Sequence, residues 1–161
     1  MYQRALQGME KALYPDHTST LGTVHNLGRL YKSQGKLDEA EKMYQWALQG
    51  YEKALGLENV ARYQPALNTI WGLGNLFADQ GRLDEAKEMY SRAYTGFQAV
   101  LGLSSNQCQQ LERCIEILPK QVRVITEAQA GVKVTANIAL DHNEKKKCPF
   151  VVRKLMRKLL R

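Results

Sequence analysis

The sequence predicts an all-α fold, a short right-handed α-solenoid of stacked helix–turn–helix repeats. The first observation is that YQRALQGMEKAL, which begins at Tyr2, recurs at Tyr44 as YQWALQGYEKAL with ten of twelve residues identical. The second is that the 22 residues from Gln34 recur from Gln80 with eleven identities. The third is the spacing of apolar residues at i, i+3 and i+4, the period of an amphipathic helix. Self-similarity at offsets of 42 and 46 residues is typical of repeat proteins.

The repeats divide the chain into units. Residues 1–14 form a half repeat, a second helix without its first, and full repeats cover about 18–56 and 62–102. Residues 104–118 then predict a capping helix, which ends before Pro119. Solenoid repeats bury their apolar faces only against neighbours, and about three are needed for stability. We therefore expect the chain to be a piece of a larger repeat protein, with upstream repeats of the same array as possible partners.

Turn signals separate the helices within each repeat. Gly35 and Gly81 lie where a left-handed residue ends a helix. The Asp-Glu pair that follows each glycine falls in the first turn of the next helix, where each acid is worth about 0.3–1 kcal/mol against the helix dipole. The hydroxyls of residues 18–20 offer a helix cap. The four-residue difference in unit length lies between residues 56 and 65, in a connection.

The C-terminal part is different in character. Residues 1–118 have a net charge of −1 and residues 119–161 a net charge of +8. Residues 119–148 mix strand-like alternation of valine with helix-like alanine, and we interpret them as a linker of uncertain structure. Residues 149–161 predict a basic amphipathic helix. Its basic face consists of Arg153, Lys154, Arg157, Lys158 and Arg161.

Composition and motifs exclude several classes of protein. No apolar run approaches the roughly 20 residues of a membrane span, and no secretory signal opens the chain. Three cysteines cannot staple 161 residues, which favours a cytoplasmic location. There is no GxxxxGK[ST], HExxH, CxxC or GxSxG motif. We therefore predict no enzyme activity, no cofactor and no metal site, and we expect no nucleic-acid partner.

Small and large residues recur at matched places in the two copies: Leu27, Gly28, Tyr31, Ala40, Tyr44 and Ala47 in one and Leu73, Gly74, Phe77, Ala86, Tyr90 and Ala93 in the next. This pattern resembles the signature of the tetratricopeptide repeat proteins. The long units and the QGKLDEAEKMYQWALQGYEKALG segment resemble the kinesin-light-chain-like type and the C-terminal repeats of fungal NLR-like (nucleotide-binding plus repeat) proteins. The family's proline near the end of the second helix is replaced by Glu52 and Gln98, which suggests a longer second helix.

The resemblance implies a binding groove along the first helices, where asparagines hold the backbone of an extended peptide. Asn26 matches the family's position, Gly72 replaces it in the second copy, and Asn75 lies one turn further on. The alternative is that the asparagines are solvated and Trp71 packs on the adjacent repeat. The candidate groove residues are His25, Asn26, Arg29, Lys32, Asn68, Trp71 and Asn75.

Two functions follow from these features. The first is a non-catalytic scaffold for protein–protein interaction, which holds a peptide or a helix in the concave groove. His25, Arg29 and Lys32 make the first copy positive, which favours an acidic partner or a peptide C-terminus. The alternative is a module that binds an anionic membrane or an acidic partner through residues 149–161. That helix could equally be solvated and folded back on the array.

Overall fold

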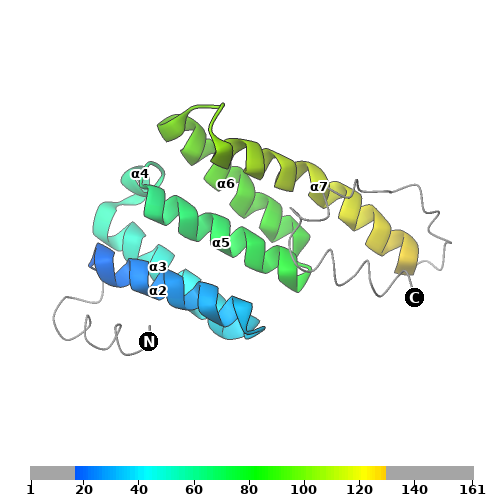
Figure 1. The fold of residues 1–161 in the computed structure, drawn as a ribbon, viewed down its shortest axis with the longest axis horizontal. Coiled ribbons are helices and arrows are strands. Elements are labelled where there is room, and N and C mark those ends of the chain that lie inside the picture. Colours follow the sequence, from blue (N-terminus) through cyan, green and yellow to red (C-terminus); the bar gives the residue numbers. More distant parts are fainter. Residues whose placement is uncertain (1–16, 130–161) are drawn as a thin grey trace.

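The computed structural model describes residues 17–129, with side chains over residues 17–118, and all regular structure in this range is helical. The repeats and helices stack in chain order, as Figure 1 shows, so the predicted all-α solenoid is confirmed. The helices are α2 (Thr18–Ser33), α3 (Leu37–Leu55), α4 (Leu57–Val60), α5 (Gln64–Gln80), α6 (Leu83–Leu101) and α7 (Asn106–Gln129).

Helices α2 and α3 form one hairpin and α5 and α6 form the next, while α7 packs along α6 (Figure 1). Helix α5 contacts both α2 and α3, so the two first helices lie side by side. None of the helices between residues 17 and 129 is long and apolar enough to cross a membrane.

The turns between paired helices follow the predicted chemistry. Gly35 and Gly81 have φ values of +77° and +81°, the left-handed region that glycine enters without steric cost. The cap of α2 differs from the expectation, because the Nδ1 atom of His17 accepts the hydrogen bond from the Ser19 N–H at 3.3 Å. The expected hydroxyl cap from residues 18–20 was therefore wrong: these residues already lie in the first turn of the helix.

The second helices, α3 and α6, each have 19 residues and are followed by the C-cap residues Gly56 and Gly102. This confirms the longer second helix inferred from the missing proline. The connection after α3 contains the short helix α4, which was not predicted and which buries the Val60 side chain completely. Pro65 at the start of α5 suits the first turn of a helix, where its missing N–H has no helical partner.

Close packing within each hairpin relies on glycine opposite a large side chain. A Cβ atom on Gly50 would lie 2.3 Å from Cδ2 of Leu21. At the equivalent position of the second repeat, a Cβ atom on Gly96 would lie 2.3 Å from Cδ2 of Leu67 and 2.8 Å from the Ala61 carbonyl oxygen. Only a residue without a side chain allows the paired helices to approach this closely.

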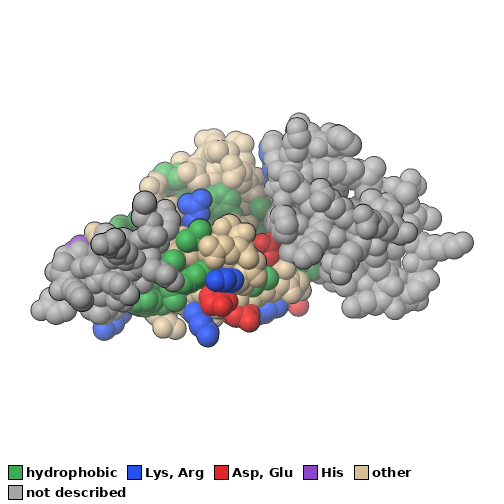
Figure 2. Space-filling view, turned by 60° about the horizontal axis from the view of Figure 1, so that its bottom comes forward, with side chains coloured by type: hydrophobic (Ala, Val, Ile, Leu, Met, Phe, Trp, Pro, Cys, Tyr) green, Lys and Arg blue, Asp and Glu red, His purple; other side chains and the backbone are tan. Residues whose placement is uncertain are grey.

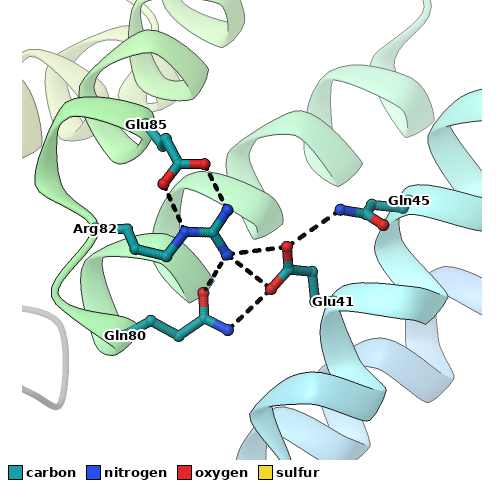
Figure 3. Close-up of polar contacts among 5 residues, drawn as sticks. All are labelled: Glu41, Gln45, Gln80, Arg82 and Glu85. Atoms are coloured by element: carbon teal, nitrogen blue, oxygen red, sulfur yellow. Dashed lines mark hydrogen bonds and ion pairs between the residues drawn. The ribbon is translucent and has the colours of Figure 1, made fainter.

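A polar network joins the two repeats (Figure 3). Arg82, in the turn before α6, donates from Nη1 to both carboxylate oxygens of Glu41 on α3 at 2.9 Å. Its other guanidinium nitrogens pair with Glu85 in the first turn of α6. The amides of Gln80 and Gln45 also donate to Glu41, at 2.9 and 3.1 Å. The Glu41 carboxylate thus accepts hydrogen bonds from residues of both repeats.

Helix α7 closes the apolar interior, with Cys108, Leu111 and Leu118 buried. It differs from the predicted capping helix in its end, because it continues through Pro119 to Gln129 instead of stopping at residue 118. A proline inside a helix removes one main-chain hydrogen bond and costs about 3 kcal/mol, but the chain beyond it can remain helical. The start of the predicted linker is therefore helical. The half repeat 1–14 and residues 130–161 lie outside the described residues.

Candidate functional site

A cavity of about 1330 Å³ lies between the first helices of the two repeats, α2 and α5. All seven candidate groove residues line it: His25, Asn26, Arg29, Lys32, Asn68, Trp71 and Asn75. They share one wall because residues three or four apart lie on one helix face, and α2 and α5 pack side by side. Glycines, Ser33, Gln34, Leu37, Pro65, Asp79 and the tyrosines Tyr44 and Tyr51 complete the lining.

An ion pair crosses the cavity between its two helices. The Nζ atom of Lys32 on α2 lies 3.2 Å from Oδ2 of Asp79 on α5, and the Asp79 side chain is only 7% exposed. The positive charge of Lys32 is thus compensated within the structure. Arg29, one turn earlier on α2, is exposed and has no ion-pair partner among residues 17–129. The net positive charge on this part of the groove is therefore smaller than the sequence predicted.

His25 is held in its neutral form. Its Nδ1 atom lies 3.1 Å from the hydroxyl oxygen of Thr69 on α5, and that hydroxyl donates its single hydrogen to the Pro65 carbonyl at 2.9 Å. Nδ1 must therefore carry the proton in this contact, which leaves Nε2 as an acceptor. Burial, helped by the charge of Arg29, lowers the pKa of His25 to about 4. At neutral pH His25 adds no charge to the cavity.

Asn75 has a fixed orientation. Its Oδ1 atom accepts a hydrogen bond of 2.9 Å from the hydroxyl of Tyr90, which is fully buried on α6. With the oxygen engaged, the amide nitrogen and its two hydrogens are the groups that remain for a ligand. Asn26 and Asn68 have no hydrogen-bond partner in the described part of the chain, and Asn68 is exposed.

Trp71 lines the cavity as expected, but among the described residues its ring packs within its own repeat and not on the adjacent one. Its ring meets Phe97 of α6 edge-on, with centroids 6.2 Å apart, so it packs within its own repeat. It also lines the cavity, and its Nε1 atom is buried without a hydrogen-bond partner among the described residues. Oδ1 of Asp79 is likewise buried and has no hydrogen-bond partner among the described residues. Two buried polar atoms at one cavity are unusual, because leaving such a group unpaired costs about 1–3 kcal/mol.

Tyr44 lines the cavity although it was not among the candidate groove residues. Its ring is 1% exposed, yet it lies against both α2 and α5. A Cβ atom on Gly72 would lie 2.9 Å from Cε1 and 3.1 Å from Cζ of this ring. This explains why glycine replaces the asparagine expected at position 72. The signal available in the sequence was a glycine at a groove position together with a tyrosine that recurs in each repeat.

Charges on the described surface are mixed. Figure 2 shows basic and acidic side chains next to one another on the face it displays. The basic residues assigned to the tail, Arg153, Lys154, Arg157, Lys158 and Arg161, lie outside the described residues.

Comparison with known proteins agrees with the repeat pattern. Residues 1–53 and residues 68–95 each match the tetratricopeptide repeat family. The first match extends over the predicted half repeat as well as α2 and most of α3. No curated protein matches the chain.

Proposed function

Because the chain is a tetratricopeptide repeat protein, we propose that it is a non-catalytic scaffold that holds an extended peptide or a helix of a protein partner in the cavity between α2 and α5. We also assign it to the kinesin-light-chain-like type and to the cytoplasm. The 19-residue second helices and the offsets of 42 and 46 residues support the first assignment, and the cysteine content supports the second.

The observation that carries the proposal is the pair of unpartnered polar atoms at the cavity. Trp71 Nε1 is a donor and Asp79 Oδ1 is an acceptor, and neither has a partner among the described residues. A peptide backbone supplies both an acceptor and a donor in every residue. Both atoms are buried, so a peptide bound in the cavity would pair with them once the side chains that cover them shift.

A phage-displayed library of random peptides, selected on the full chain, tests this proposal. The informative variant is Asn26→Ala plus Asn68→Ala, because neither amide has a structural partner among residues 17–129. Asn75 is less suitable, since its removal would leave the Tyr90 hydroxyl buried and unpaired. Gln49→Ala plus Gln98→Ala, on exposed positions outside the cavity, is the matched control. Loss of peptide capture in the first variant alone supports the groove; equal capture in both contradicts it.

A second candidate function rests on the sequence of residues 149–161. From residue 151 to residue 161, pairs of apolar residues alternate with pairs of basic residues, and Arg161 follows the last apolar pair. Each Lys or Arg near an anionic surface contributes about 1 kcal/mol. The test is co-sedimentation of the full chain with phosphatidylserine vesicles. Replacing Arg153, Lys154, Arg157 and Lys158 with glutamate should abolish binding to these vesicles. If the variant still binds the vesicles, residues 149–161 are not the membrane-binding element.

A further inference from the structure

The Tyr44 side chain reaches the cavity from α3, with its hydroxyl end toward Gly72. Tyr44 belongs to α3, the helix behind the groove, and its ring passes between Gly28 of α2 and Gly72 of α5. The Cζ atom, which carries the hydroxyl, is 3.1 Å from the place where a Cβ atom of Gly72 would be, and both residues line the cavity. No hydrogen-bond partner for this hydroxyl exists among residues 17–129.

A second ring that carries a hydrogen-bond acceptor lies beside the ring of Tyr44. The ring centroid of His25 is 5.4 Å from that of Tyr44, and the rings are tilted by 59°. Since Nδ1 of His25 is bound to Thr69, Nε2 keeps its lone pair, and it too has no partner among the described residues. The Tyr44 hydroxyl and the His25 Nε2 atom thus belong to two neighbouring rings that both line the cavity.

We propose that Tyr44 and His25 form an amide-binding subsite on the floor of the groove, in which the Tyr44 hydroxyl donates to the carbonyl oxygen and His25 Nε2 accepts from the N–H of one amide of the partner. The inference rests on the proposed function, and it names the chemistry at one position of the bound peptide. The amide is either a backbone peptide group or the side chain of an Asn or Gln.

Taken without Arg29, which lines the same cavity, the two groups match an amide better than a charged ligand. A carboxylate would accept from the tyrosine but would place its second oxygen against the lone pair of the neutral imidazole. An ammonium group has only donors and leaves the hydroxyl of Tyr44 without an acceptor for its hydrogen. Burial raises the pKa of Tyr44 to about 12, so the phenol stays protonated and able to donate at neutral pH.

The second repeat lacks an equivalent subsite. Tyr90 occupies the same position as Tyr44, but its hydroxyl donates to Asn75 at 2.9 Å, and Tyr90 does not line the cavity. At the position of His25 the second repeat has Trp71, which offers a donor only. The amide subsite is thus a property of the first repeat, where it fixes the register of a bound peptide.

The test uses a peptide selected by the full chain from the random library, with its affinity measured for wild type, Tyr44→Phe and Tyr94→Phe. Tyr94, on α6 outside the cavity, is the matched control. Tyr44→Phe keeps the ring and removes only a hydroxyl without a partner, so it should fold as wild type does. We expect its Kd to rise about tenfold, which is the loss of one hydrogen bond to a buried amide, and that of Tyr94→Phe to stay within about twofold.

Changes in the peptide then identify the source of the amide. Replacing each Asn or Gln by Leu tests the side chains, and N-methylation of each residue tests the backbone. The change at the peptide position that occupies the subsite should weaken binding to wild type but have little further effect on binding to Tyr44→Phe. If Tyr44→Phe binds as wild type while Asn26→Ala plus Asn68→Ala has lost binding, the subsite is refuted and the groove stands. If no variant changes capture of the peptide, both the proposed binding groove and the subsite within it are refuted.

Discussion

Arg82 and Glu41, which are 41 residues apart, lie 2.9 Å from each other across the junction of the two repeats. Arg82 also lies 4.1 Å from the ring centroid of Phe77, which orients the guanidinium group. This ion pair joins the turn before α6, in the second repeat, to α3, the second helix of the first repeat.

Glu41→Gln tests the contribution of this pair. The amide removes the charge but keeps the shape, and the guanidinium group, which remains partly exposed, loses its main anchor on α3. We expect the free energy of unfolding to fall by about 1 kcal/mol, the upper range for a pair near the surface. Urea denaturation followed by circular dichroism measures it. Glu88→Gln, at an exposed position of α6, is the control and should change stability by less than about 0.5 kcal/mol.

Gly96→Ala should destabilise the protein by about 2 kcal/mol, because a Cβ atom would lie 2.8 Å from a backbone carbonyl that cannot move easily. Gly22→Ala is the matched control. Its Cβ atom would meet only the Tyr51 hydroxyl at 3.8 Å, and alanine in a helix is favoured over glycine by about 1 kcal/mol. Thermal denaturation should therefore move the two melting temperatures in opposite directions. Equal shifts would show that the helices do not approach as closely as described.

Stability should depend on pH through His25. The folded-state pKa of about 4 is below the unfolded value of 6.5, so the unfolded chain binds the proton more readily. The stability that neutral His25 provides is complete above pH 6.5 and is lost as the pH falls toward 4. Between pH 7.5 and 5 we expect wild type to lose about 1–2 kcal/mol more than His25→Gln. Denaturant titrations at both pH values measure this difference, and parallel losses would contradict the burial of His25.

Much of the groove could be predicted because it follows from local periodicity. Positions on one face of a helix are set by the 3.6-residue period, so the seven candidates could be assigned to one wall once the repeat was recognised. Gly35 and Gly81 could be assigned to left-handed turns for the same local reason.

The partners of the groove residues could not be predicted, because they depend on contacts between elements far apart in the chain. Lys32 is paired with Asp79 and His25 with Thr69, across α2 and α5. The role of Tyr44 depends on Gly72 of the next repeat. Position in a helix predicts which face a side chain occupies, but only packing decides which charges and hydrogen-bonding groups remain free.

The central claim is that the cavity between α2 and α5 binds a peptide, and the indole N–H resonance of Trp71 tests it most directly. In a ¹H–¹⁵N spectrum of the full chain, addition of a selected peptide should shift the Trp71 indole signal, because its Nε1 atom has no partner in the described structure. The indole of Trp46, on α3 and outside the cavity lining, should stay in place. A bound peptide that moves the Trp46 signal and leaves that of Trp71 unchanged would contradict the account.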